Sequence, residues 1–174
     1  MKKADVWVST VLYTAIGVVV VAMILSVSIP LINKMRDRNI IIQTKELMYV
    51  LDKNIRKVIE EGPGSQRDLS PLEIARGQLF IDLNNDNKIK WKLETKELIS
   101  EPGIPIQEGT ITMLLEETKV KELYLVSLDL DYKDIANINL ESSYGNPFTG
   151  KYGLLIKNTG EYTNNLPKVA IKII

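Results

Sequence analysis

The first 61 residues of the chain carry a helical pattern that changes character partway along. Every residue from Val6 to Asn33 is uncharged, a run of 28 residues that would be roughly 42 Å long as a helix at ~1.5 Å per residue. A helix of that length can cross a bilayer. Farther along, apolar residues recur every three or four positions between charged ones, which predicts an amphipathic helix. Its apolar stripe consists of Ile40, Thr44, Leu47, Leu51, Ile55 and Val58.

We predict one helix from Asp5 to Glu61, ended by Gly62-Pro63-Gly64, through which no helix continues. Pro30 lacks the amide hydrogen of an internal helix residue and predicts a kink or local melting. Two helices broken near Pro30 and Asn39 are the alternative interpretation. In both interpretations the chain divides into a basic leader (residues 1–4), an apolar helix (5–33), an amphipathic helix (34–61) and a β-rich domain (65–174).

Beyond Gly64 the hydrophobic period becomes two, which is typical of strands with one buried face. The alternation is strongest over residues 88–94 and 124–132. Further strands are expected at residues 78–83, 110–115, 137–141, 152–157 and 168–173, each bounded by turn residues. Ser70-Pro71-Leu72-Glu73 fits a helix capping box, but we favour a strand there, in a hairpin that turns at Arg76-Gly77. The predicted fold class is α+β, with the long N-terminal helix packed on a C-terminal antiparallel β-sheet or β-sandwich.

Composition narrows the classes of function. The chain has no cysteine and no histidine, which excludes thiol nucleophiles, disulfides, imidazole bases and zinc clusters. Residues 1–61 carry nine Lys/Arg against six Asp/Glu, and residues 62–174 carry thirteen against sixteen. Neither part has the basic stripe with interleaved aromatic residues that nucleic-acid binding requires. We therefore expect no enzyme, no cofactor and no nucleic-acid partner.

One short stretch has the residue types of a metal site. Asp82, Asn84 and Asp86 occupy positions 1, 3 and 5 of a calcium loop of the EF-hand type. Position 6 is Asn87 where such loops have glycine, and position 12 is Leu93, which offers no carboxylate. We favour a hairpin turn in which Asn and Asp adopt left-handed backbone angles. The neighbouring pairs Asp129 with Asp131 and Glu116 with Glu117 are interpreted as a solvated face.

The order of segments resembles a known family. Residues 2–14 (KKADVWVSTVLYT), an uninterrupted apolar helix, Ser28-Ile29-Pro30, an amphipathic helical stretch and a C-terminal β-domain are similar to archaeal type IV pilin-like proteins with class III signal peptides, most closely those of small-genome archaea. The resemblance implies a filament subunit whose leader is cut between Ala4 and Asp5 by a prepilin peptidase, and which pilus assembly machinery then incorporates. It also implies a cell-membrane precursor and an extracellular filament on the cell surface.

Two features depart from that family pattern. The fifth residue of the processed chain would be Ser9, where members often carry a carboxylate, and the chain has no Asn-x-Ser/Thr glycosylation acceptor. The nearest acid is Asp5 itself. A further conflict concerns orientation, since Lys34, Arg36 and Arg38 follow the span and by charge count favour a cytoplasmic β-domain. We follow the resemblance and expect that domain outside, because the leader must face the cytoplasm to be cut there.

Three roles for the apolar helix compete: a cleaved secretory signal, a membrane anchor for a domain that binds a partner without polymerising, and the core of a homo-oligomeric filament. A secretory signal has an apolar region of only about 7 to 15 residues, so we set it aside. Small residues in helical spacing allow helices to approach closely, which favours the filament. The expected membrane or filament-core residues are Val6, Trp7, Val11, Ala15, Gly17, Val20, Ala22, Ser26 and Pro30.

Overall fold

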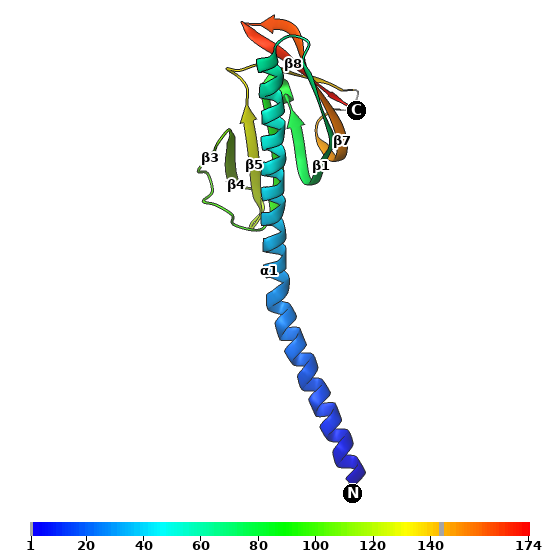
Figure 1. Cartoon of the computed structure of the whole chain (residues 1–174). Coiled ribbons are helices and arrows are strands. Elements are labelled where there is room, and N and C mark those ends of the chain that lie inside the picture. The colour runs from blue at the N-terminus through cyan, green and yellow to red at the C-terminus, as the bar shows by residue number, and fades with distance from the viewer. Residues whose placement is uncertain (1, 143–144) are drawn as a thin grey trace. The chain divides into compact units, whose positions relative to one another are not determined.

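The structure is a computed structural model that describes residues 2–142 and 145–174, without the side chains of residues 2–6 and Asn84. It begins with one α-helix, α1 (Lys2–Glu61), which passes through Pro30 without interruption (Figure 1). The single predicted helix is therefore confirmed, and the interpretation with two helices is wrong. By its internal contacts the chain forms two compact units, Met1–Asn39 and Ile40–Ile174.

The second unit combines the C-terminal part of α1 with one eight-stranded sheet, so the fold class is α+β as predicted. The strands lie in the order β3-β4-β5-β2-β1-β7-β8-β6, and every neighbouring pair is antiparallel except β6 with β8. That parallel pair at one edge was not predicted. The bounds are β1 Gln66–Ile81, β2 Lys88–Thr95, β3 Ile106–Glu108, β4 Ile111–Glu117, β5 Tyr124–Asp131, β6 Asn137–Glu141, β7 Phe148–Thr163 and β8 Leu166–Ile173, with a short 3-10 helix at Leu83–Asn85.

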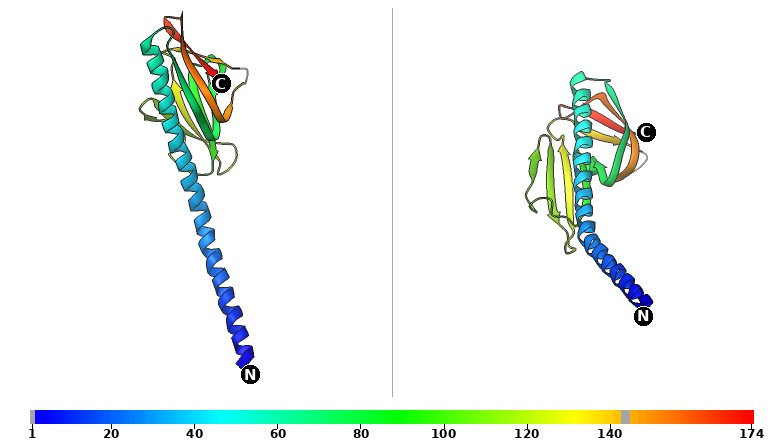
Figure 2. Two further views of the ribbon diagram at one scale, coloured as in Figure 1. Left: turned by 45° about the vertical axis from the view of Figure 1, so that its right-hand side comes forward. Right: turned by 60° about the horizontal axis from the view of Figure 1, so that its bottom comes forward.

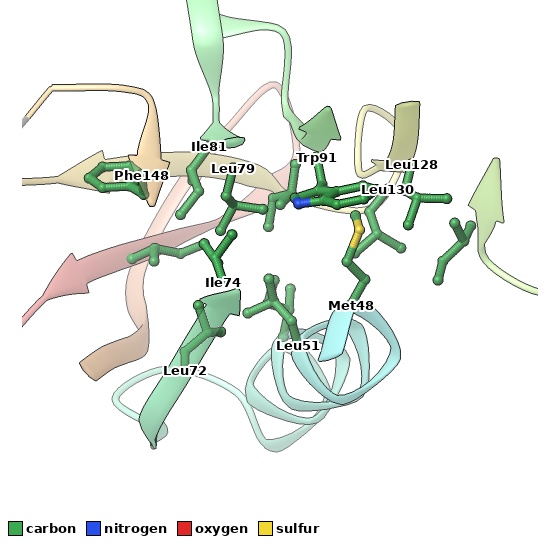
Figure 3. Close-up of a cluster of buried hydrophobic side chains, with 14 of the residues drawn as sticks. Met48, Leu51, Leu72, Ile74, Leu79, Ile81, Trp91, Leu128, Leu130 and Phe148 are labelled. Carbon is green, nitrogen blue, oxygen red and sulfur yellow. The ribbon is translucent and has the colours of Figure 1, made fainter. Parts of the chain in front are cut away.

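The core of this unit lies between the sheet and residues 40–61 of α1. The sheet curves around the helix, with strands to both sides of it (Figure 2). Met48 and Leu51 point from the helix toward the sheet, and Met48 lies against Trp91 of β2 (Figure 3). Met48 and Trp91 are both fully buried, whereas Leu47, which the sequence placed on the stripe, is only half-buried. The buried stripe therefore follows the prediction at Ile40, Thr44, Leu51, Ile55 and Val58, and Met48 takes the place predicted for Leu47.

The C-terminal end of α1 is fixed to the sheet by polar contacts. Gly62 adopts φ +89° and ends the helix where the sequence predicted. The buried side chain of Asn158 on β7 donates from Nδ2 to the Val58 carbonyl at 3.3 Å, and Ser65 Oγ donates to the same carbonyl at 2.6 Å. These bonds satisfy a carbonyl that the helix itself leaves without a partner.

The predicted hairpin at Arg76-Gly77 is wrong. β1 is one continuous strand of 16 residues. It pairs with β7 from Gln66 to Ile74 and again at Leu79, with register shifts after Leu69 and after Ile74, and it pairs with β2 over residues 78–81. Gly77 has φ +81° and lies where the register with β7 shifts, between Ile74 and Leu79, and the Arg76 carbonyl there accepts the Trp91 indole hydrogen at 2.9 Å. A glycine with positive φ suits a bulge as well as a turn.

The first prediction concerns Gly77→Ala. A Cβ at this position would lie 2.5 Å from the Lys92 carbonyl oxygen and 2.6 Å from Trp91 Nε1. We expect the free energy of unfolding to fall by about 3 kcal/mol, of which about 1–2 is the cost of the left-handed angle and the rest is steric. Chemical denaturation of the variant and of the native chain measures the change in the free energy of unfolding.

Gly64→Ala is the matched control, because Gly64 has a similar φ of +85° and a Cβ added there would meet no described atom within 4 Å. We expect it to lose only the backbone part, about 1–2 kcal/mol. Equal losses at the two positions would contradict the steric account of Gly77.

A second prediction follows from the location of the core. Among the described residues, the buried cluster extends from Ile40 to Ile171 and includes no residue of the apolar run. Deletion of residues 1–33 should therefore give a soluble, β-rich monomer that unfolds cooperatively. Circular dichroism measures the β-structure and the cooperativity of unfolding, and size-exclusion chromatography measures the oligomeric state. Insoluble or unfolded material would show that the apolar half of α1 is needed for the domain to fold.

Candidate assembly segment

The candidate site is the apolar part of α1. Between Trp7 and Met35 all large apolar side chains are exposed in the single chain, from 48% at Val20 to 76% at Trp7. Transferring one such side chain out of water is worth about 1.5–3 kcal/mol, so the whole segment in water would cost tens of kcal/mol. By length and composition α1 can cross a membrane, and a signal sequence near an N-terminus satisfies the same criteria. The segment requires an apolar environment of some kind.

Three small residues of this segment lie on one face of the helix. At 3.6 residues per turn, Ala15, Ala22 and Ser26 fall within a narrow sector. Val11 borders the same sector, whereas Gly17 and Val20 fall on the opposite side. Of the predicted core residues, the helix therefore brings Val11, Ala15, Ala22 and Ser26 together and separates Gly17 and Val20 from them. A neighbouring helix can approach closely along the face of Ala15, Ala22 and Ser26.

Two hydroxyl groups of the apolar segment find their partners inside the helix. Thr14 Oγ1 donates to the Thr10 carbonyl at 2.9 Å, and Ser26 Oγ donates to the Met23 carbonyl at 2.7 Å. Neither group therefore needs water, so each is tolerated in lipid or in a dry protein core. Pro30, one turn after Ser26, lies within the helix and lacks an amide hydrogen.

The predicted processing site lies where only the main chain is described. Ala4, Asp5 and Val6 belong to the first turns of α1, and their side chains lie outside the described part of the structure. Ser9, the fifth residue after the predicted cut, is exposed.

The Asp82 segment forms the turn between β1 and β2. Asp82, Asn85 and Asn87 have φ angles of 48°, 57° and 54°, as predicted for a turn of Asn and Asp residues. Asp82 Oδ1 accepts the Asn87 amide at 3.0 Å, and Asp86 Oδ1 accepts the Lys88 amide at 3.1 Å. Burial raises the pKa of Asp82, and the nearby charge of Asp86 adds to the rise while the Asn87 amide opposes it.

These oxygen atoms are therefore engaged by the turn itself. The second carboxylate oxygen of Asp86 is paired with the Lys90 ammonium group. The side chain of Asn84 lies outside the described part of the structure. Within the described residues, no group of three or more acidic side chains is arranged to hold a metal ion.

The aspartates of β5 lie across from lysines of β2 in the ladder. Asp131 receives the Lys88 ammonium at 2.7 Å. Asp129 lies directly across from Lys90 in the ladder, and burial raises its pKa although nearby lysine charges oppose the rise. Glu116 and Glu117 are exposed at the end of β4.

One buried polar contact was not predicted. Asp52 is a charged residue between the stripe positions Leu51 and Ile55, yet it is buried and accepts the Tyr132 hydroxyl at 2.9 Å. Arg56 Nε donates to both of its carboxylate oxygens at 3.0 Å. Burial, and then the Asp52 charge, raise the pKa of Tyr132 well above its usual range. The contact fixes the end of β5 to α1, and the only sequence signal was a tyrosine that continues the alternation of that strand.

Comparison with protein-family models, with curated proteins and with solved structures gives no match to this chain.

The third prediction tests the turn interpretation of the Asp82 segment. A ligand at a hundred times its dissociation constant would stabilise the native state by about 2.7 kcal/mol, a shift of several degrees at about 2–4 °C per kcal/mol. We expect the melting temperature in millimolar calcium to differ by less than ~1 °C from that in the presence of a chelator. Asp82→Ala should lose about 1 kcal/mol with or without calcium, because its bond to the Asn87 amide is lost. A calcium-dependent stabilisation that Asp82→Ala abolishes would contradict the turn interpretation.

Proposed function

We propose that this protein is the structural subunit of an extracellular type IV pilus-like filament that serves adhesion or surface contact. The observation that carries the proposal is the apolar run of α1, exposed on all sides from Trp7 to Met35. A folded domain with its own core follows that run in the chain. The resemblance of the segment order to archaeal pilin-like proteins supports the same role.

The proposal requires two environments in succession. In the membrane, lipid covers the apolar segment, and the helix satisfies the hydroxyls of Thr14 and Ser26 internally. After extraction from lipid, the same surface stays dry only when it packs against other copies. The face that carries Ala15, Ala22 and Ser26 allows such close packing.

The contacts between copies should be head-to-tail. The subunit has an apolar helix at one end of its sequence and a charged β-domain at the other, so two copies do not present identical surfaces along the helix. Head-to-tail contacts that do not close on themselves produce open helical filaments. The apolar segments would then form the filament core, and the β-domains would form its outside.

The life cycle that follows has defined partners. A prepilin peptidase would cut between Ala4 and Asp5, and pilus assembly machinery would move the processed subunit from the cell membrane into the filament. No catalytic group takes part in this role, and the sequence has no cysteine and no histidine. The alternative function is an anchored β-domain that binds a partner without polymerising.

The fourth prediction separates these two functions with Val20→Lys. A lysine at a helix centre costs about 2.5–3.5 kcal/mol in a bilayer, which one helix with long apolar flanks can sustain. In a filament every subunit repeats that buried charge, so we expect the variant to insert into membranes but to form no filaments. Membrane fractionation and electron microscopy of the same cells measure the two outcomes.

Val20→Leu is the control and should both insert and assemble, since it keeps the segment apolar. Normal filaments from an inserted Val20→Lys protein would contradict the proposal. That result would favour the anchored domain.

A further inference from the structure

Three exposed apolar side chains lie in two loops of the β-domain. The loop of residues 96–105 joins β2 to β3, and residues 118–123 join β4 to β5. Leu98, Ile104 and Val120 in these loops are 57%, 48% and 61% exposed. Contiguous exposed apolar side chains mark interaction sites, whereas single ones are common on any protein surface, so the relative positions of the two loops matter.

The two loops begin side by side at one end of the sheet. Thr95 pairs with Tyr124, and Tyr124 pairs with Glu117. The Gly103 amide donates to the Leu115 carbonyl at 2.7 Å, which folds the longer loop back against β4. We call residues 96–105 and 116–123 the lobe.

The lobe lies toward the Ile40 end of the helix within the second unit. Tyr132, just after β5, contacts Asp52, and β5 runs alongside α1 in the same direction (Figure 1). The start of β5 therefore lies about 26 Å back along the strand at ~3.3 Å per residue. Along the helix, Ile40 lies about 18 Å back from Asp52 at ~1.5 Å per residue.

The charge of the lobe is opposite to that of the helix segment that follows the apolar run. The lobe carries three lysines and five glutamates, a formal −2, and residues 34–38 carry Lys34, Arg36 and Arg38 against Asp37, a formal +2. Those three basic side chains are exposed. Just before and among them lie the exposed apolar side chains Leu31, Ile32 and Met35.

We propose that in the assembled filament the lobe of one copy docks on residues 31–38 of a second copy's helix. Leu98, Ile104 and Val120 pack against its apolar residues, and the lobe glutamates face its basic residues. This inference rests on the proposed function, since it describes a contact inside that filament. The two surfaces differ, so each copy gives its lobe to one neighbour and its helix to another, which makes an open chain of contacts. The excess of glutamate disfavours an anionic lipid surface as the occupant.

Disulfide trapping tests the contact cleanly, because the native chain has no cysteine. In the full-length protein we combine Leu98→Cys with Met35→Cys, assemble filaments and oxidise them. We expect a ladder of linked chains longer than dimers on a denaturing gel. Each single variant should give at most dimers. Leu98→Cys with Tyr162→Cys is the matched control, since Tyr162 is similarly exposed near the end of β7, and it should give no ladder.

Other trapping results would overturn the proposal. An internal disulfide would show that the lobe contacts its own helix, and dimers alone would show a symmetric contact. The lobe would instead lie on lipid if no cross-link forms and if anionic vesicles protect the thiol at position 98 from an aqueous maleimide. No cross-link without that protection would show that the lobe is free in the filament.

Charge reversal provides a second measurement. Arg36→Glu with Arg38→Glu should reduce filament yield at least tenfold, as should Glu97→Lys with Glu101→Lys, and the four changes together should restore it. Loss without restoration would contradict the charge pairing. If wild-type protein forms no filaments, the proposed function fails as well. If wild-type filaments form but no variant changes their yield and no ladder appears, only the lobe contact fails.

Discussion

The apolar half of α1 imposes the constraint that governs where this protein can exist. Some eighteen large apolar side chains between Trp7 and Met35 have no cover in the single chain, and the cost of hydrating them far exceeds the marginal stability of an ordinary domain, about 5–15 kcal/mol. This segment is therefore stable only where lipid or protein covers it. The β-domain tolerates either environment for the helix, because its own core begins at Ile40.

The same constraint gives the basic residues after the span a second interpretation. By charge count alone, Lys34, Arg36 and Arg38 conflict with an external β-domain. If the β-domain lies outside the membrane, as we propose, these charges are available to pair with the acidic lobe of a neighbouring copy. In that arrangement the short basic leader would fix the orientation of the helix, and the later charges would serve assembly.

Sequence patterns predicted those elements whose periodicity is local. The helix end at Gly62, the alternation of β2 and β5 and the turn at Asp82 all follow from residues close together in the chain. Gly77 misled the prediction because one glycine with positive φ serves a hairpin turn or a bulge, and only the distant partner strand β7 decides which. Strand order, the parallel β6–β8 pair and the burial of Asp52 against Tyr132 likewise depend on contacts between remote residues. The candidate site, the apolar run, could be identified in full from the sequence. The exposed Leu98 and Val120 of the lobe became significant only when the strand register placed their loops side by side.

Electron cryomicroscopy of filaments sheared from the native cell surface tests the central claim most directly. We expect a core of packed helices about 8–10 Å apart, free of lipid, into which residues 6–33 can be built, with the eight-stranded domains on the outside. Filaments composed of another protein, with this chain found only in the membrane fraction, would contradict the claim.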